Sequence, residues 1–420
     1  MKHMKDMPYH SGIKFRAYMS TEQQKIADAN LGAARFIYNR LVIWNDQLYR
    51  MKKVASLVPA YRSRIEYLEA ALRSATGLKN AIPFLFCGID SQMIADTIAN
   101  YHKAWKMFRT MPGTGIPTTR KFSYDRSYQT SPHYPKEAKG LNSGNVKLVD
   151  RHHLQIPILG KVKISGSPDR IQFLMDNTAY MRFGTITVSV DEVSRYYISV
   201  QLGSTIPFVK DPPKTGKAVG IDMNVENFFA DSDGNIVGSP KHRRGIQKDL
   251  VKTQRRLSRR RESAKAEGRP LRTSKNYQET RRRAALLQAK AAGRREHFQH
   301  EVSKKLIMEN KIIVAEDLKV KNLMKNHKLA FAIADQAWGA FFEKLKRKAF
   351  LYGRIYIKVP AKNTTQTCHK CGHVLSGDSR LTLEDREWTC PSCGTHYIRD
   401  VNAAKVILRR GLELLAANAA

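Results

Sequence analysis

The sequence predicts a multidomain protein that combines an α+β part with an α/β part, and three observations lead to this fold class. The 420 residues give room for about two to four domains, since one domain takes roughly 150 residues. The hydrophobic period changes along the chain, from helical spacing to strict alternation and then to short apolar strands separated by helices. Two pairs of cysteines near the end mark a further, small unit.

The first hundred residues are expected to be mainly helical. A short strand, KFRAYM at 14–19, comes before Ser20, which forms a possible capping box with Gln23 at the start of a long amphipathic helix. Two further helices are expected, over 61–74 and 91–108. The segment that follows, 110–131, is rich in Pro, Gly, Thr and Ser, which is typical of a loop or linker.

Alternating apolar and polar residues dominate the next stretch. TITVSVDEV at 185–193 alternates strictly, and RYYISVQL at 195–202 repeats the pattern after a short turn. KVKIS at 161–165 and IQFLM at 171–175 have a similar character. Period-two segments separated by turns predict an antiparallel sheet, which we expect to close into a small barrel.

From about residue 215 the chain has the pattern of an α/β unit. AVGIDM at 218–223 is an apolar strand, and the Asp233-Gly234 pair predicts a hairpin turn between two further strands. The later elements are expected to be a strand in KIIVAEDL (311–318), a helix over 334–351, a strand in RIYIKVPA (354–361) and a C-terminal helix that begins near Asp400.

A strongly basic segment interrupts this unit. Residues 241–300 hold 20 Lys or Arg against 5 acidic residues, and Gly268 and Pro270 mark a turn, which predicts two long helices joined by that turn. A charge run is often only a solvated helix face, but such faces usually mix the two signs, so we favour a phosphate-binding surface. The arginines expected to contact nucleic acid are Arg243, Arg244, Arg255, Arg256, Arg259, Arg260, Arg281, Arg282 and Arg283.

The whole chain is basic as well. It carries 73 Lys and Arg against 37 Asp and Glu, a formal net charge of +36. Such an excess repels itself unless a polyanion neutralises it, so nucleic acid is the first expected partner and an anionic membrane surface the second. No run of about 18 apolar residues is present, and the first residues lack an apolar signal core. We therefore expect neither a membrane-spanning helix nor secretion, and predict a cytoplasmic protein.

The cysteines indicate a metal site. Four of them form two C-x2-C pairs separated by eighteen residues, a spacing typical of a zinc ribbon. They are Cys368, Cys371, Cys390 and Cys393. Two disulfides are the alternative, but an odd number of cysteines and a reducing compartment argue against them. The neighbouring histidines that could replace a thiolate are His369, His373 and His396. The fifth cysteine, Cys87, lies in an apolar run and is expected to be a buried small side chain.

Three acidic residues stand where packing alone would not place them. Asp222 lies within an apolar strand, Glu316 ends another, and Asp400 stands at the start of the last helix. Carboxylates are seldom buried unless they are paired, hydrogen-bonded or bound to a metal. If the three converge, they form an all-oxygen site suited to Mg²⁺ or Mn²⁺, and two such ions about 4 Å apart can support phosphodiester cleavage. The alternatives are a helix N-cap for Asp400 and a solvated strand end for Glu316.

These motifs together resemble the TnpB family, transposon-associated proteins that are similar to compact type V CRISPR effectors. GIDMNVENFFADSDG, IIVAEDLKV, and CHKCG…CPSCG followed by RDVNAAKVIL resemble the three RuvC motifs and the zinc ribbon of that family. IADQAWGAFFEKLKRKAFLYG, VPAKNTTQTCHKCG and TEQQ…ARFIYNRLV are further points of similarity. The resemblance is strong from about 215 to 408, weaker over 14–50 and mainly architectural between them.

The resemblance implies a particular domain organisation. It implies an RNase H-like (RuvC) nuclease core with a basic helical insertion and a zinc ribbon, together with an N-terminal β-barrel wedge domain and a helical recognition domain. The implied boundaries are 1–19 and 136–210 for the wedge domain, 20–135 for the recognition domain, 211–365 and 396–420 for the nuclease domain with its insertion at 241–300, and 366–395 for the zinc ribbon.

The resemblance also implies an RNA-guided DNA endonuclease that works by a two-metal mechanism. By the family pattern Asp222, Glu316 and Asp400 bind Mg²⁺ (or Mn²⁺) and carry out cleavage, and the four cysteines bind a structural Zn²⁺. The implied partners are a noncoding guide RNA and a double-stranded target DNA, of which the protein itself reads only a short target-adjacent motif. The implied location is the cytoplasm of a prokaryote, at the nucleoid.

Candidates for reading the target-adjacent motif rest on the resemblance alone. They are Tyr38, Asn39 and Gln92. The alternative for Gln92 is a place on the polar face of a helix, and the alternative for the other two is packing between helices. Both alternatives stay open at this point.

Four other functions compete with a transposon-encoded guided nuclease. An RNA-guided DNA-binding repressor without cleavage is disfavoured, because all three carboxylates are present. A transposase that joins DNA ends accords with the carboxylates but not with the ribbon and the basic insertion. A basic zinc-bearing RNA-binding protein explains the charge but not the placed carboxylates. A compact type V CRISPR effector has the same chemistry, and the sequence does not separate it from a transposon-encoded protein.

Overall fold

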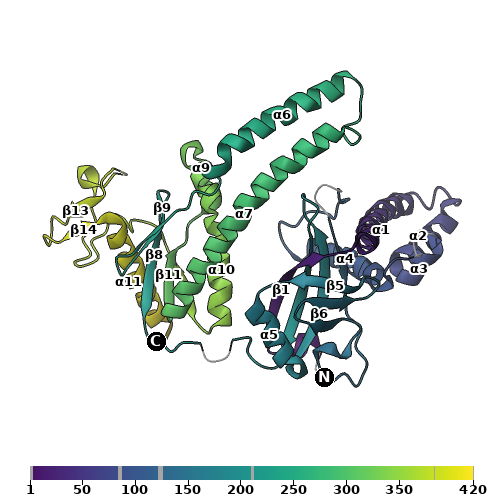
Figure 1. Cartoon of the computed structure of the whole chain (residues 1–420), viewed down its shortest axis with the longest axis horizontal. Coiled ribbons are helices and arrows are strands. Elements are labelled where there is room, and N and C mark those ends of the chain that lie inside the picture. The colour runs from purple at the N-terminus through teal and green to yellow at the C-terminus, as the bar shows by residue number, and fades with distance from the viewer. Residues whose placement is uncertain (1–2, 84–87, 122–125, 210–211, 383, 420) are drawn as a thin grey trace. The chain divides into compact units, whose positions relative to one another are not determined.

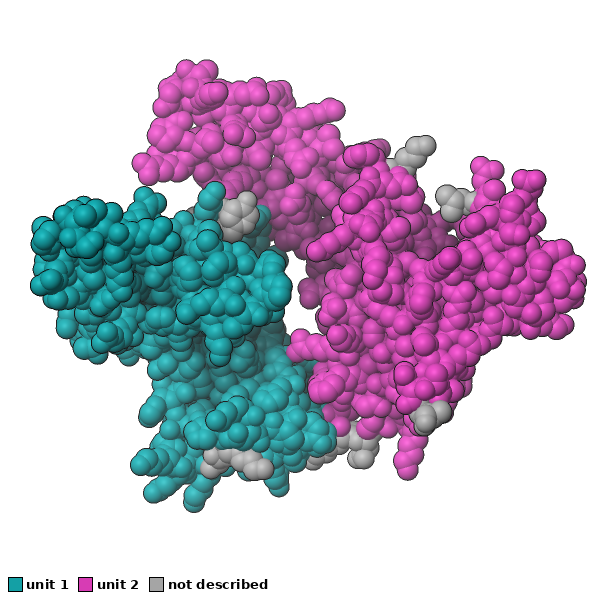
Figure 2. Space-filling view, turned by 180° about the vertical axis from the view of Figure 1, so that it is seen from behind, with its two compact units in different colours: residues 1–208 teal, residues 209–420 magenta. Residues whose placement is uncertain are grey.

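Two compact units make up the chain (Figures 1 and 2). The computed structural model describes residues 3–83, 88–121, 126–209, 212–382 and 384–419. Unit 1 is Met1–Phe208 and unit 2 is Val209–Ala420. Cys87, expected to be a buried small side chain, lies outside the described residues. Across the described ranges, every helix is too short or too polar to traverse a bilayer.

In the described part of unit 1, seven antiparallel strands form one sheet in the order β2-β6-β7-β1-β5-β4-β3. The strands are β1 (Tyr9–Tyr18), β2 (Ser127–Thr130), β3 (Lys147–Asp150), β4 (His153–Ile156), β5 (Gly160–Ser165), β6 (Met181–Val190) and β7 (Tyr196–Ser204). The alternating segments predicted as strands at 161–165, 185–193 and 195–202 are confirmed as β5, β6 and β7. Among the described residues β2 and β3 form the two edges of the sheet, so its closure into a barrel stays a prediction.

Two segments of unit 1 differ from the sequence prediction. IQFLM at 171–175, predicted as a strand, lies in the helix α5 (Pro168–Asp176). Ile171 and Leu174 are both buried, and their separation of three residues is a helical spacing that the short run had concealed. The predicted loop at 110–131 ends in β2, which pairs with β6 and buries every second side chain.

The predicted helices of unit 1 are confirmed. They are α1 (Thr21–Lys53), α2 (Tyr61–Arg73) and α4 (Ser91–Thr110), and a short α3 (Ala75–Ala81) that was not predicted follows α2. The capping box is present: Ser20 Oγ accepts from the backbone N of Gln23 at 3.2 Å, and Gln23 Oε1 accepts from the backbone N of Ser20 at 3.1 Å. The apolar side of α1 packs against α2 and α4.

The described residues of unit 2 form a five-stranded mixed sheet in the order β10-β9-β8-β11-β12. The strands are β8 (Ala218–Met223), β9 (Asn227–Asp231), β10 (Ile236–Gly238), β11 (Ile312–Glu316) and β12 (Ile355–Val359). β11 runs parallel to both β8 and β12, whereas β9 is antiparallel to its neighbours. The predicted Asp233-Gly234 turn joins β9 to β10, and Gly234 has the positive φ of +96° that such a turn requires. The α/β prediction for this unit is therefore confirmed.

The basic segment forms two long helices, as predicted. α6 (Gln247–Ala266) and α7 (Lys275–Glu309) lie side by side as a hairpin in Figure 1. We call residues 241–300 the basic arm. The remaining helices of unit 2 that precede the cysteines are α8 (Val320–Leu323), α9 (His327–Gln336) and α10 (Trp338–Leu351). The single helix predicted over 334–351 is wrong in one respect, because the chain breaks between α9 and α10 at Ala337, which has a left-handed φ of +50°.

The C-terminal helix α11 (Arg399–Ala419) packs directly on the sheet, against β8, β9, β11 and β12. Two glycines allow this close approach. A Cβ on Gly220 would overlap the carbonyl oxygen of Ala404, and a Cβ on Gly411 would overlap the side chain of Val314. Because the helix lies so close to the strands, its first turn is held near the end of β8.

The cysteine-rich segment between β12 and α11 is small and has its own core. Two short strands, β13 (Glu387–Thr389) and β14 (His396–Ile398), pair as an antiparallel hairpin. The buried residues of this segment are Cys368, Leu375, Trp388, Cys390 and Tyr397. Two of these five are cysteines, so the packing of the segment depends on its thiols.

Candidate active site and metal centre

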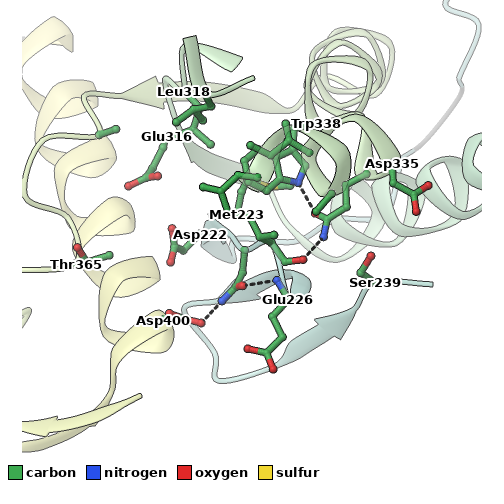
Figure 3. A pocket seen from close by; sticks show the side chains of 18 of the residues that line it. Asp222, Met223, Glu226, Ser239, Glu316, Leu318, Asp335, Trp338, Thr365 and Asp400 are labelled. Carbon is green, nitrogen blue, oxygen red and sulfur yellow. Dashed lines mark hydrogen bonds between the residues drawn. The ribbon is translucent and has the colours of Figure 1, made fainter. Parts of the chain in front are cut away.

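The three predicted carboxylates line a single cavity of about 1140 Å³ in unit 2. Asp222 is 6% exposed and Glu316 is 5% exposed, and the Asp400 side chain is 15% exposed. Figure 3 shows the three carboxylates along one side of the cavity, with Asp222 between the other two. The predicted convergence of these residues in one place is therefore observed.

The topology of unit 2 explains why residues so distant in sequence meet. β8 and β11 are parallel neighbours in which Ile221 pairs with Ala315, so Asp222 and Glu316 lie side by side at the carboxyl ends of their strands. Carboxyl ends of parallel strands are where ligand sites commonly form in open α/β sheets. Asp400 is the second residue of α11, which packs on β8, and so it reaches the same edge from the helix side.

Burial makes Asp222 and Glu316 hard to ionise, and for Asp222 the neighbouring carboxylates add to this effect. Burial, followed by the charges of Glu316 and Asp400, raises the pKa of Asp222 well above its ordinary value. Burial also raises the pKa of Glu316, although a hydrogen bond from Thr364 and the charge of Arg410 lower it in part. Such clustered acids ionise readily when a cation neutralises them, which is the electrostatic signature expected of a cation site.

Neighbouring side chains fix two of the three carboxylates. Asn224 Nδ2 donates to Asp400 Oδ2, and Arg399 Nε donates to Asp400 Oδ1 at 3.1 Å. Thr364 Oγ1 donates to Glu316 Oε1. The sequence prediction missed all three donors. Asn224 and Arg399 stand within two residues of a predicted carboxylate, which was the available signal, whereas Thr364 comes from the loop after β12 and gives no comparable signal.

The donor atoms around the cavity suit a hard divalent cation. The described residues that line it supply carboxylates, amides and hydroxyls, and neither histidine nor cysteine. Oxygen ligands of this kind favour Mg²⁺ or Mn²⁺ over Zn²⁺.

The four predicted cysteines form a compact cluster, with their Sγ atoms within 4.8 Å of one another. The separations of 3.7 Å between Cys368 and Cys393, and between Cys371 and Cys390, are far longer than a disulfide bond of about 2.0 Å. All four thiols are free, so the disulfide alternative is wrong for this structure. The cluster could hold one tetrahedral ion such as Zn²⁺. In the described residues, no histidine joins the cluster.

The local backbone prepares these thiols for a metal. Burial opposes the ionisation of Cys368, but hydrogen bonds from the backbone N–H of Cys371 and from the Tyr397 hydroxyl outweigh it, and the pKa of this thiol falls to about 6. Burial raises the pKa of Cys390 to about 11. A bound cation would favour the thiolate form of each of its cysteine ligands.

The predicted nucleic-acid-binding arginines lie on the basic arm. Eight of the nine are exposed: Arg243, Arg244, Arg255, Arg256, Arg259, Arg281, Arg282 and Arg283. Arg260 is half-buried instead, and its guanidinium donates to the carbonyl of Asn276 and the hydroxyl of Thr280, so it joins α6 to α7. The contact of these arginines with nucleic acid stays a prediction.

The three candidate readers in unit 1 have partners within the protein. Tyr38 is 4% exposed, with the guanidinium of Arg120 at 3.6 Å from its ring centroid. Asn39 exchanges two hydrogen bonds with the backbone of Arg120, at 2.6 and 3.0 Å. Gln92 donates to Asp96 at 3.3 Å. Their observed contacts are structural ones, and contact with a target-adjacent motif stays a prediction.

Three family models match the chain. A model described as a probable transposase matches residues 197–327, a model described as a Cas12f1-like TNB domain matches 338–407, and a model described as a helix-turn-helix domain matches 7–53. The last of these segments forms β1 and the single long helix α1 here, and not two helices joined by a turn.

Curated relatives are similar over half or most of the chain. A putative RNA-guided DNA endonuclease of Streptomyces pristinaespiralis is 39% identical over 229 residues, which are 54% of this chain and 53% of that protein, so the match spans about half of each. The putative RNA-guided DNA endonuclease InsQ of Escherichia coli (strain K12) is 29% identical over 426 residues, 96% of this chain and 93% of that one.

The similarity to a solved structure concerns the fold alone. The protein in a Cas12f1-sgRNA-target DNA complex has a TM-score of 0.52 and 16% identity, over 95% of this chain and 98% of that one. The three family models follow one another along the chain, and the full-length relative InsQ extends the likeness through both units. On this combination of motifs, models and relatives, the chain is similar to the TnpB family along most of its length.

Proposed function

We propose that this protein is an RNA-guided DNA endonuclease, and that Asp222, Glu316 and Asp400 hold Mg²⁺ or Mn²⁺ for phosphodiester cleavage. The observation that carries the proposal is the meeting of these three carboxylates in one cavity, from positions far apart in the chain. The relatives named as putative RNA-guided DNA endonucleases support the guided activity.

The chain's own residues prepare the carboxylates for this chemistry. When bound, two divalent ions would activate a water molecule and stabilise the leaving oxygen of the cleaved strand. Burial keeps Asp222 and Glu316 away from bulk water. Once they are ionised, their attraction for a bound cation is therefore screened little by solvent. Asn224 and Arg399 orient the two oxygens of Asp400.

The cavity also suits a nucleic-acid strand. Lys241, Arg244 and Arg386 stand among its lining residues and offer positive charge to phosphate groups. Leu329 and Phe331 give the same cavity an apolar wall, against which unpaired bases and sugars can pack. The cavity thus combines carboxylates for the metal ions, basic side chains for the phosphates and an apolar wall for the bases. This combination suits cleavage of a single displaced strand.

The basic arm and the cysteine cluster complete the proposal. We assign the exposed arginines of the basic arm to phosphate contacts with the guide RNA or the target DNA, and the four cysteines to a structural Zn²⁺. In this assignment the wedge (1–19 and 136–210) and recognition (20–135) domains correspond to unit 1, which ends two residues before the proposed boundary at 210. The nuclease domain (211–365 and 396–420) and the zinc ribbon (366–395) correspond to unit 2.

The test is guided cleavage by the purified protein with its copurifying RNA. Sequencing that RNA identifies the guide and separates a transposon-encoded protein from a CRISPR effector. Double-stranded DNA that matches the guide should be cut with Mg²⁺ and left intact in its absence. Asp222→Ala should abolish cutting while guided DNA binding is retained, and Asp233→Ala, an exposed carboxylate of the same unit, should cut like the wild type.

Each other outcome identifies a different protein. Guided binding with no cutting in Mg²⁺ or Mn²⁺ would leave a DNA-binding repressor. Loss of both binding and cutting in Asp222→Ala, together with a lower melting temperature, would make Asp222 a structural residue and remove the basis of the proposal.

A further inference from the structure

The break between α9 and α10 is a strained corner that the proposed chemistry does not use. Ala337 adopts a left-handed φ of +50°, a strained conformation for a non-glycine residue that persists only where neighbours enforce it. The residues on either side, Gln336 and Trp338, are 6% and 4% exposed. All three belong to the IADQAWG run, whose physical role the sequence left unexplained.

Gln336 is buried with partners for both ends of its amide. Its Nε2 donates to the carbonyl oxygen of Val225 at 2.8 Å and to that of Asn227 at 2.9 Å. Its Oε1 accepts from the indole Nε1 of Trp338. Burying an amide costs free energy unless it regains the hydrogen bonds that it loses from water. An apolar side chain would fill the same space without this cost, so packing alone does not explain Gln336. The position therefore needs an amide for its two donors.

Of the two carbonyls that Gln336 binds, that of Val225 belongs to the loop between β8 and β9, and that of Asn227 belongs to the first residue of β9, directly after the loop. The same loop carries Asn224, whose Oδ1 accepts from the backbone N of Glu226 at 2.8 Å and whose Nδ2 donates to Asp400. In Figure 3 dashed bonds run from Trp338 toward this loop, and a second pair runs from Glu226 to Asp400. Gln336 thus fixes the loop that orients one of the three carboxylates.

The other side of the corner is fixed to the root of the basic arm. Gln299 of α7, 1% exposed, donates through Nε2 to the carbonyl oxygens of Gln336 at 2.7 Å and Ala337 at 3.2 Å. The carboxylate of Asp335 accepts from the backbone N of Arg243 at 2.9 Å. These hydrogen bonds fix residues 335–337 to the basic arm. Because this segment is fixed, the Gln336 side chain can hold the β8–β9 loop in one position.

We propose that Gln336 is a positioning residue for the carboxylate site: through the loop 224–226 it sets the place of Asn224 and hence the orientation of Asp400. The inference rests on the proposed nuclease function. Supporting residues that orient metal ligands typically cost 10–100-fold in metal affinity or activity when they are replaced, although they touch neither metal nor substrate. We expect an effect of that size at Gln336.

The test compares Gln336→Met, which keeps the length of the side chain but removes its donors, with a matched control. Asn310→Leu removes another buried amide of unit 2, which is 4% exposed and donates to the Leu306 carbonyl at the far end of α7. Three quantities are measured on the protein–RNA complex: the affinity for Mn²⁺ by electron paramagnetic resonance, the single-turnover rate of cleavage, and the affinity for matched DNA.

Gln336→Met should lose about 10–100-fold in Mn²⁺ affinity and cleave more slowly, with DNA affinity within about twofold of the wild type. Asn310→Leu should melt at a lower temperature as well but keep the Mn²⁺ affinity and cleavage rate of the wild type. If Gln336→Met fails to fold, Trp338→Phe replaces it. This variant removes the donor to Gln336 Oε1 and keeps an aromatic ring at the position, and a smaller loss in the same direction is expected.

A double-mutant cycle separates positioning from general destabilisation. Because Gln336 acts through Asn224, the double variant Gln336→Met with Asn224→Ala should bind Mn²⁺ about as weakly as Asn224→Ala alone. Multiplicative effects, or wild-type Mn²⁺ affinity in Gln336→Met, would overturn the inference. A wild type that binds Mn²⁺ but never cuts matched DNA would instead overturn the proposed function, and the Mn²⁺ comparison would still decide the role of Gln336.

Discussion

Neutralising one buried carboxylate should stabilise the metal-free protein, and the gain should depend on pH. The ordinary pKa values of Asp222 and Glu316 are 3.8 and 4.5, and both are raised in the folded state. The folded state therefore binds these protons more tightly than the unfolded state does. The protonated carboxyls therefore contribute to the free energy of unfolding at low pH. This contribution is lost as the pH rises from about 4, the ordinary pKa, to the raised pKa of each carboxyl in the folded state.

The magnitude follows from this linkage. One carboxyl inside its titration window changes the free energy of unfolding by at most about 1.4 kcal/mol for each pH unit. Asp222→Asn removes the charge and keeps the shape, so its advantage over the wild type should grow from near zero at pH 4 by up to that amount per unit. For a unit of about 200 residues this corresponds to roughly 3–5 °C in melting temperature per pH unit.

The assay is thermal unfolding between pH 4.5 and 8 in buffer free of added divalent cations, with the wild type, Asp222→Asn and the exposed control Asp233→Asn. Adding Mg²⁺ should then raise the melting temperature of the wild type and change that of Asp222→Asn less, because a ligand stabilises the state that binds it. A difference that does not vary with pH, or a wild type that is the more stable protein throughout, would refute the reasoning.

Three further predictions test the rest of the site. Cys390→Ser should abolish zinc binding and expose the cysteine-rich segment to protease, since structural Zn²⁺ contributes about 10–16 kcal/mol in small zinc domains. Mass spectrometry measures the zinc content of the variant, and one zinc ion per chain would contradict the prediction. Changing the arginines 281–283 to Gln should lower the slope of log affinity against log salt by about 0.9 for each phosphate group that the variant no longer neutralises, as filter binding over a salt series would show; an unchanged slope would remove them from the interface. Gly220→Ala should slow cleavage and lower the melting temperature, because its Cβ overlaps the Ala404 carbonyl, whereas Gly238→Ala meets no atom within 4 Å and should do neither.

The carboxylate site could be predicted from sequence because each member carries a local signal. An acidic residue in or at the end of an apolar strand, as at Asp222 and Glu316, is costly unless it serves a purpose, and that cost is visible without a structure. What the sequence lacks is the register that pairs β8 with β11, and the close approach of α11 that Gly220 and Gly411 permit. These are long-range contacts, so convergence itself could only be assumed.

The errors have a physical cause of the same kind. IQFLM at 171–175 is too short for its period to distinguish helix from strand, and the contacts of α5 decide it. The apolar spacing of residues 334–351 continues across Ala337, so the sequence pattern does not predict the break between α9 and α10. Hydrogen bonds from Gln299 and to the β8–β9 loop stabilise this break, and they join residues far apart in the chain.

The cysteine cluster and the carboxylate cavity are parts of one structure. Arg399, which holds Asp400, also donates to the Thr382 carbonyl in the cysteine-rich segment at 2.8 Å, and Arg386 of that segment forms a 2.6 Å ion pair with Glu226 on the β8–β9 loop. Thr382 and Arg386 both line the cavity. Loss of the structural metal should therefore loosen a wall of the cavity and the support of one carboxylate. Cleavage by Cys390→Ser should accordingly fail under conditions in which the basic arm still binds nucleic acid.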